Sequence, residues 1–161
     1  MMRASGRFLI LLLIAAFLTA LTACDDYPKD PGGTLERLRG GIVRAGHVEN
    51  PPWAMREDGH MRGSEVELVE RFAASLDATV EWSDLSGHQA LRALKEQNLD
   101  IVVGGFVQSD PWSAEVGFTR PYIPGTKHVM AVPNGENAWL VALERFLKGQ
   151  APRNSTGAAQ P

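Results

Sequence analysis

The sequence predicts an α/β domain with three layers, in which a mostly parallel sheet is flanked by helices. Two patterns support this prediction. Apolar segments of strand length alternate with segments whose apolar residues recur at helical spacing, and this alternation implies βαβ units. Residues 99–103 are also apolar except for Asp100, which is typical of a strand buried on both faces of a parallel sheet. We expect the domain to span residues 34–148, a length at which one core can fold alone.

The first part of the domain is predicted to contain a short helix, a strand and a hairpin. Thr34 is placed to cap the short helix. Residues 42–48 are predicted to form the first strand, which a turn at Pro51-Pro52 ends. Asp58-Gly59 is a turn signal of the kind that joins two antiparallel strands.

Two longer helices are predicted from capping signals that precede an apolar face. Ser64 and Glu67 match a capping box, in which a hydroxyl and a carboxylate satisfy amides at the start of a helix. Ser86 and Gln89 match a second one. The residues expected on the buried faces are Val69, Phe72, Ala73 and Leu76 in the first helix and Ala90, Leu91 and Leu94 in the second.

The remaining strands are predicted at residues 78–82, 99–103 and 128–132. Asn134 is placed to cap the last helix. That helix is expected to turn five apolar residues inward: Trp139, Leu140, Leu143, Phe146 and Leu147.

Residues 1–23 match a secretory signal peptide. Arg3 and Arg7 precede an apolar run over residues 8–21, which is too short for a membrane span because a spanning helix needs roughly 20 residues. Cys24 then closes the tetrapeptide Leu-Thr-Ala-Cys, which resembles the lipobox of bacterial lipoproteins. The resemblance implies that Cys24 is lipidated; the alternative is a free or buried thiol after an ordinary signal peptide.

Lipidation at Cys24 would anchor the chain, because two or more acyl chains hold a protein on a membrane. Asp25 resembles the signal that keeps many such lipoproteins in the inner membrane, facing the periplasm. Residues 24–33 are expected to form a flexible membrane tether, and residues 149–161, which lack large apolar side chains, a disordered tail.

Composition excludes several classes of function. A net charge of −3 without clustered Lys and Arg argues against a nucleic-acid partner. A single cysteine cannot form an internal disulfide. His60, His88 and His128 lack metal-ligand spacing, so neither a metal nor a cofactor is predicted. No Ser/His/Asp or paired-carboxylate arrangement points to an enzyme.

Four stretches follow one another in an informative order. They are residues 41–46, an Asn-Pro-Pro-Trp turn at residues 50–53, residues 59–68, and residues 100–122 (DIVVGGFVQSDPWSAEVGFTRPY). In order and spacing they resemble the extracellular solute-binding proteins of family 3, the receptors of amino-acid ABC importers. The resemblance covers residues 38–148 and implies a lobe of the type 2 periplasmic-binding-protein fold.

Two departures from that family change what the resemblance implies. Complete receptors have two lobes, but here residues 128–132, soon after Pro121-Tyr122, resemble the return of the family's chain into its first lobe. We therefore expect a single lobe, with the second lobe missing. Trp112 stands where amino-acid receptors place the Arg that binds the α-carboxylate. The ligand is therefore expected not to be a standard amino acid.

Ligands of open α/β sheets lie beyond the carboxyl ends of the strands. By this rule the candidate ligand-binding residues are His47, Glu49, Trp53, Gly104, Gly105, Phe106 and Trp112. The two glycines could present free amides or simply form a tight turn. The tryptophans could form an aromatic platform or cover the core, and His47 could be a ligand or a switch. Asp100 is expected to order a helix-to-strand junction.

Three classes of function follow. The favoured one is a membrane-anchored solute-binding component related to an ABC importer, which binds a small polar solute and contacts a permease. The alternative is a periplasmic interaction module that uses the open face of the lobe, through Trp53, Phe106 and Trp112, for self-association or for another protein. An enzyme has the least support, because Cys24 would carry lipid.

Overall fold

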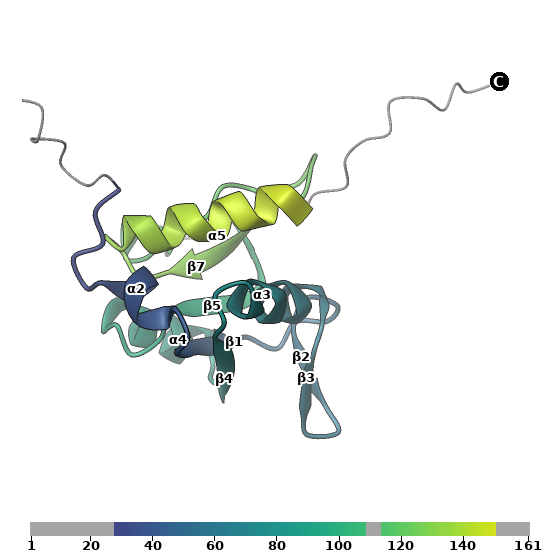
Figure 1. Ribbon diagram of the computed structural model, residues 1–161. Coiled ribbons are helices and arrows are strands. Elements are labelled where there is room, and N and C mark those ends of the chain that lie inside the picture. The colour runs from purple at the N-terminus through teal and green to yellow at the C-terminus, as the bar shows by residue number, and fades with distance from the viewer. Residues whose placement is uncertain (1–27, 109–113, 151–161) are drawn as a thin grey trace, which may run out of the picture.

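The computed structural model describes residues 28–108 and 114–150 (Figure 1). Helices and strands alternate along most of this chain, as the sequence predicts. In chain order they are α2 (Thr34–Leu38), β1 (Ile42–His47), β2 (Met55–Glu57), β3 (His60–Arg62), α3 (Ser64–Ala74), β4 (Thr79–Asp84), α4 (Gly87–Lys95), β5 (Ile101–Val107), β6 (Gly117–Phe118), β7 (His128–Val132) and α5 (Asn137–Gln150).

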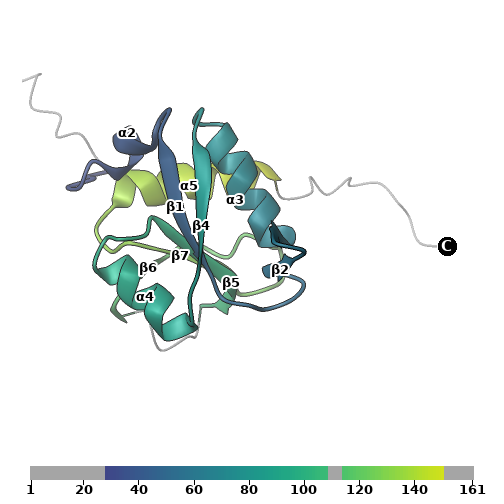
Figure 2. The ribbon, with the colours of Figure 1, turned by 90° about the horizontal axis from the view of Figure 1, so that it is seen from below.

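The central sheet has the strand order β4-β1-β5-β7-β6. Strand β1 is parallel to both β4 and β5, and it lies beside β4 in Figure 2. Strand β7 is antiparallel to both of its neighbours, β5 and β6, so it alone opposes the common direction. The prediction of a mostly parallel sheet is confirmed.

Strands β2 and β3 form a separate antiparallel hairpin. Its turn holds Asp58 and Gly59 at positive φ, as their turn signal predicts.

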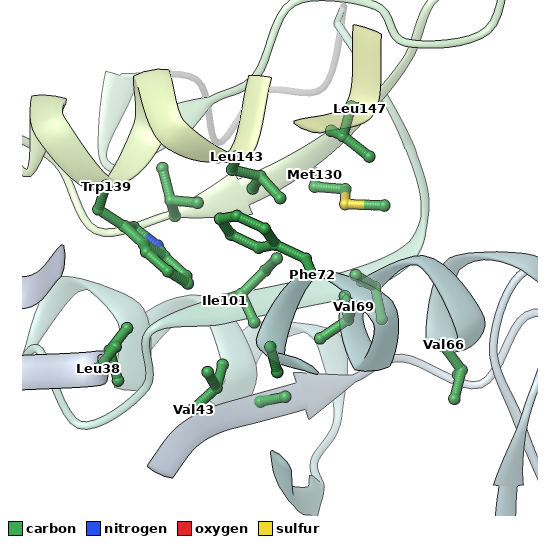
Figure 3. Packing of buried hydrophobic residues seen from close by; sticks show 14 of the residues in the cluster. Leu38, Val43, Val66, Val69, Phe72, Ile101, Met130, Trp139, Leu143 and Leu147 are labelled. Atoms are coloured by element: carbon green, nitrogen blue, oxygen red, sulfur yellow. The ribbon is translucent and has the colours of Figure 1, made fainter. Parts of the chain in front are cut away.

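Helices cover both faces of the sheet, which gives three layers. On one face, α2, α3 and α5 enclose the larger core (Figure 3). On the other face, α4 packs against a smaller cluster. Strand β5 contributes residues to both clusters, because successive side chains of a strand point to opposite faces of the sheet. Ile101 and Val103 belong to the larger core, and Val102 belongs to the smaller one. The predicted inward faces of the helices are confirmed for most residues: Trp139, Leu143 and Leu147 are buried in α5, and Leu140 and Phe146 pack partly buried against the same core. Leu76 lies beyond the end of α3 and is only partly buried.

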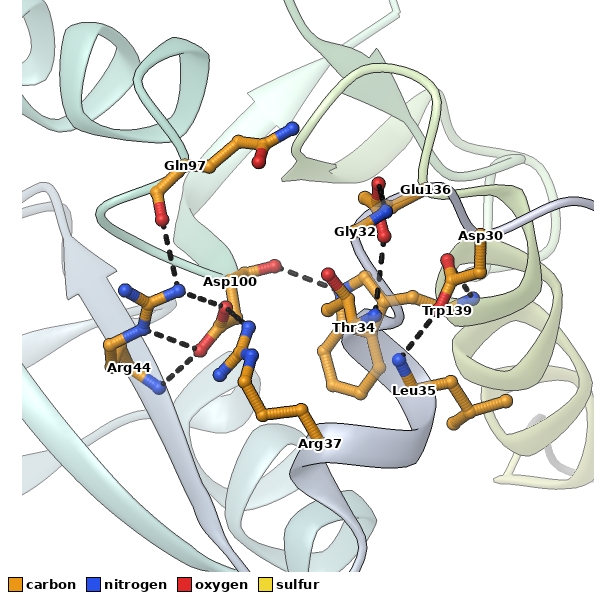
Figure 4. Close-up of polar contacts among 10 residues, drawn as sticks. All are labelled: Asp30, Gly32, Thr34, Leu35, Arg37, Arg44, Gln97, Asp100, Glu136 and Trp139. Carbon is orange, nitrogen blue, oxygen red and sulfur yellow. Dashed lines mark hydrogen bonds and ion pairs between the residues drawn. The ribbon is translucent and has the colours of Figure 1, made fainter.

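A buried carboxylate joins the sheet to the helix layer (Figure 4). The Asp100 side chain is 1% exposed and accepts hydrogen bonds from Arg37 Nη2 at 2.6 Å and Arg44 Nη2 at 2.7 Å. Burial alone would raise the pKa of Asp100, but the hydrogen bonds from Arg44 and Arg37 outweigh it and lower that pKa. The Trp139 indole N–H donates to the Asp100 carbonyl at 2.8 Å. Asp100 therefore orders the junction before β5, as expected.

Two carboxylates distant in sequence cap α2 and α5 (Figure 4). The Asp30 carboxylate accepts from the Leu35 amide at 2.7 Å and the Trp139 amide at 3.3 Å. Glu136 accepts from the Gly32 amide at 2.9 Å and the Thr34 amide at 3.3 Å. Burial, with Glu136 nearby, raises the pKa of Asp30. The amide donors lower the pKa of Glu136 although burial acts the other way.

The local caps expected at Thr34 and Asn134 are therefore wrong. Helix α2 has no side-chain cap from its own N-cap residue, Gly33, and α5 begins three residues after Asn134. The last residues of the expected tether are also held by the domain, because Lys29 O accepts the Asn137 amide at 3.0 Å. At the other end α5 continues to Gln150, so residues 149–150 are helical.

The two predicted capping boxes have different outcomes. The Ser86 amide donates to Gln89 Oε1 at 3.1 Å and both halves of the box are present, which confirms the second box. The first box is wrong: Ser64 already lies inside α3. The first amides of α3 donate instead to the carbonyls of Pro52 and Trp53, at 3.1 and 3.0 Å. The loop after β1 therefore caps this helix.

No helix in residues 28–108 and 114–150 is long and apolar enough to cross a membrane. The expected signal peptide (residues 1–23), Cys24, Asp25, Trp112 and residues 151–161 lie outside the described residues.

Candidate ligand-binding site

The carboxyl ends of β1 and β5 meet at one edge of the sheet. Strand β5 has a register shift between Val102 and Phe106, and this irregular stretch contains Gly104 at φ 151° and Gly105 at φ 69°. A Cβ on Gly104 would lie 2.7 Å from the Val48 carbonyl oxygen, and one on Gly105 would lie 2.5 Å from Trp53 Cδ1. The loop after β1 thus approaches the backbone of Gly104 and Gly105 so closely that only glycine fits at both positions. Of the two interpretations of these glycines, the structure favours the tight turn.

The amides of Gly104 and Gly105 are not free, which argues against the interpretation that makes them available to a ligand. Both donate to Glu65 Oε2, at 2.8 and 2.9 Å. The Tyr122 hydroxyl donates to the other carboxylate oxygen, Glu65 Oε1. Glu65 is fully buried in the first turn of α3. Burial, followed by the Glu65 carboxylate, raises the pKa of Tyr122 above its ordinary value.

Sequence reasoning missed Glu65 as a site residue, although a signal was present. Glu65 precedes Val69 by four residues and Phe72 by seven, so it falls on the buried face of the predicted helix. A carboxylate on an apolar helix face needs buried donors. Those donors come from β5 and from the segment after β6, and the sequence does not reveal that these segments are adjacent.

A second polar group surrounds His47 at the end of β1. His47 is 4% exposed. Its Nδ1 lies 3.3 Å from Asp84 Oδ1 but makes no hydrogen bond. Its Nε2 lies 3.6 Å from Glu49 Oε2. Arg56 joins the hairpin to both carboxylates: Nη2 donates to Asp84 Oδ1 at 2.6 Å, and the amide donates to Glu49 Oε2 at 3.2 Å. The hydrogen bond from Arg56 lowers the pKa of Asp84. Asp84 therefore already holds a cation of the protein itself, whereas Glu49, within the described residues, accepts only the backbone amide of Arg56.

The two aromatic candidates within the described residues are half-buried. Trp53 packs on His128 with ring centroids 4.0 Å apart, and Phe106 lies 6.3 Å from Phe118 by the same measure. The structure thus places Trp53 beside Gly105 and brings the His47 group and the glycine turn to the same sheet edge. Among residues 28–108 and 114–150 no group of three or more His, Cys, Asp or Glu could hold a metal ion.

Comparison with known families agrees with this architecture. The model of a family described as "Bacterial extracellular solute-binding proteins, family 3" matches residues 42–156. The chain belongs to this family. Among curated family relatives, the probable amino-acid-binding protein YxeM of Bacillus subtilis (strain 168) is 26% identical over 125 residues, which is 76% of this chain and 46% of that protein. The arginine-binding extracellular protein ArtP of the same strain is 26% identical over 114 residues, 70% of this chain and 43% of ArtP. The chain spans about half the length of these relatives.

Solved structures confirm the fold as that of a single lobe of a type 2 periplasmic-binding protein. Domain 1 of TmArgBP, described as an arginine-bound form, superposes with a TM-score of 0.64 at 20% identity and covers 71% of this chain and 97% of that domain. The ancestral cationic amino-acid solute-binding protein AncCDT-1 gives a TM-score of 0.64 at 14% identity, over 72% of this chain and 93% of AncCDT-1. A second structure of AncCDT-1 is described as that of a precursor of cyclohexadienyl dehydratase.

Proposed function

We propose that this chain is a membrane-anchored solute-binding lipoprotein that serves an ABC-type importer and binds a small polar solute other than a standard amino acid. Family membership supports the solute-binding role. The single lobe is compatible with binding, because domain 1 of TmArgBP, which matches over 97% of its length, is described as arginine-bound. A permease is the partner that this role requires.

The observation that carries the choice of ligand is the charge at the sheet edge. Glu49, Glu65 and Asp84 lie there, and the one arginine among the described residues of this edge, Arg56, is bound to Asp84. The amides of Gly104 and Gly105 are held by Glu65. A ligand carboxylate would thus find neither a free guanidinium nor that amide pair. A neutral or cationic polar group suits this edge better.

The anchor is proposed from the sequence. Cys24 follows a short apolar segment that matches a signal peptide, and acyl chains at this position would hold the domain on the periplasmic side of the inner membrane, for which Asp25 is the retention signal. The interaction-module alternative gains no support, because Trp53 and Phe106 are half-buried against their neighbours. Self-association stays a prediction.

A thermal-unfolding screen tests the proposed ligand class. The chain without residues 1–23 is heated alone, with each standard amino acid, and with a panel of amines, polyols and other polar solutes that lack an α-carboxylate. A ligand at 100 times its dissociation constant stabilises the folded state by about 2.7 kcal/mol, so a tight ligand gives a clear shift. We expect stabilisation from the second panel only. Stabilisation by a standard amino acid at micromolar concentration would contradict the proposal.

A further inference from the structure

A groove of 540 Å³ lies on the lobe between the segment that follows β6 and the C-terminal half of α5. Its less exposed lining is apolar and aromatic, with Tyr122, Val141 and Leu147, apart from the half-buried Glu144. Its exposed lining combines two prolines, Pro121 and Pro124, with three basic residues, Arg120, Arg145 and Lys148. This groove is lined by none of the seven residues that the sequence singles out as ligand candidates.

The charges of this groove are unbalanced. Glu144 is its one acidic residue, and it is engaged by Arg120, whose amide donates to Glu144 Oε1 at 2.8 Å and whose Nε lies 3.7 Å from Oε2. Within the part of the chain that the structure describes, Arg145 and Lys148 have neither an ion pair nor a side-chain hydrogen bond. The whole chain carries a net charge of −3, so the positive charge beside this groove is opposite in sign to the net charge of the protein.

The end of α5 alone does not explain this arrangement. A cation in the last turn interacts favourably with the helix dipole, which accounts for Lys148 as a stabilising residue. The dipole does not require an apolar groove beside that turn. Nor does it require Arg120, which comes from the opposite wall and whose side chain is 88% exposed.

We propose that this groove docks an acidic segment of a partner polypeptide. An apolar side chain of the segment packs on Tyr122 and Leu147, while its carboxylates pair with Arg145 and Lys148. Charge complementarity favours this partner, and aromatic and Arg side chains are the residue types enriched at protein interfaces. The Tyr122 hydroxyl also bonds to Glu65, so the docked segment touches the ring that closes the buried cluster at the ligand edge. The proposal does not depend on the identity of the solute.

Peptide binding to the full chain in a neutral detergent tests the proposal. The probe is a fluorescein-labelled peptide of alternating glutamate and leucine, measured by fluorescence anisotropy at low and high salt. Peptides of alternating lysine and leucine, and of glutamate and serine, are the comparison probes. We expect the glutamate–leucine peptide to bind at least tenfold more tightly than either, and more weakly at high salt.

A double variant, Arg145→Gln with Lys148→Gln, locates the binding. A matched pair, Arg39→Gln with Arg92→Gln, removes the same charge from exposed positions elsewhere. We expect at least a tenfold loss of affinity in the first variant and less than a twofold change in the second, with unchanged circular dichroism in both. Equal loss in both variants, unchanged affinity in the first, or no binding of the glutamate–leucine peptide to the wild type would overturn the proposal.

Lipid is the competing occupant. Detergent micelles that carry phosphatidylglycerol are compared with micelles that carry phosphatidylcholine. We expect the peptide affinity to differ by less than twofold between them. Displacement of the peptide by phosphatidylglycerol alone would show that the groove binds an anionic headgroup, and the protein-docking proposal would be wrong.

Discussion

Glu65→Leu tests whether the buried Glu65 carboxylate stabilises the sheet edge at the carboxyl ends of β1 and β5. The substitution keeps a side chain of similar size but removes both carboxylate oxygens. The amides of Gly104 and Gly105 and the hydroxyl of Tyr122 then lose their common acceptor. A buried donor without a partner costs about 1–3 kcal/mol. Because two of these three donors are only partly buried, we expect the free energy of unfolding to fall by about 3 kcal/mol.

Glu65→Gln separates the hydrogen bonds from the charge. Its amide oxygen can still accept from both glycines, and its NH₂ group can donate to the Tyr122 oxygen. We expect a loss of about 1 kcal/mol, in the range of one neutral hydrogen bond. Glu70→Leu on the exposed side of the same helix is the matched control and should change stability by no more than about 0.5 kcal/mol.

Urea unfolding, followed by tryptophan fluorescence, measures all three variants. Domains of this kind have a total stability of about 5–15 kcal/mol, so a loss of about 3 kcal/mol is readily resolved. If Glu65→Leu is as stable as the wild type, the three donors have other acceptors and the buried cluster is not what holds the turn of β5.

Three further predictions concern other parts of the chain. Asp100→Asn should lower the free energy of unfolding by about 2 kcal/mol at pH 7, because Arg37 and Arg44 lose their counter-charge. Since the pKa of Asp100 is lowered in the folded state, its stabilising contribution is present above about pH 4 and is lost as the pH falls. Urea titrations in acid should therefore give the wild type and the variant the same stability. The pKa of Tyr122 is raised by folding, so as the pH rises the unfolded chain loses this proton first, and the free energy of unfolding should decline above about pH 10. In alkaline urea titrations, the free energy of unfolding of Tyr122→Phe should decline less steeply. Cys24→Ser should abolish acylation and leave an uncleaved or mislocalised precursor, whereas incorporation of an acyl-chain probe into the variant would contradict the lipid anchor.

The parts of the fold that the sequence predicts well depend on local patterns. The sequence predicts a strand over residues 128–132, and β7 has these same bounds because Pro133 ends the apolar run. The buried residues of α4 follow from helical spacing alone. Where the pattern is ambiguous, the bounds shift: β5 begins two residues after the expected start and extends to Val107 through its glycine turn.

The features that sequence analysis missed depend on contacts between distant segments. Asp30 caps α5 across 109 positions, so a search for nearby capping residues selects Asn134 instead. Glu65 meets its donors 39, 40 and 57 positions away. The register shift in β5, which brings the glycines to Glu65, has no counterpart in the apolar pattern. Sequence therefore predicts which edge of the sheet is the candidate site, but not that the amides there are already engaged.

Native mass spectrometry of the chain, purified in mild detergent from the membranes of its own host, tests the central claim most directly. One spectrum reports both the mass of the anchored N-terminus and any solute retained by the folded domain. We expect a chain that begins at Cys24 with added acyl groups and carries a polar solute without an α-carboxylate. A chain without acyl groups, or one that releases a standard amino acid on unfolding, would contradict the proposal.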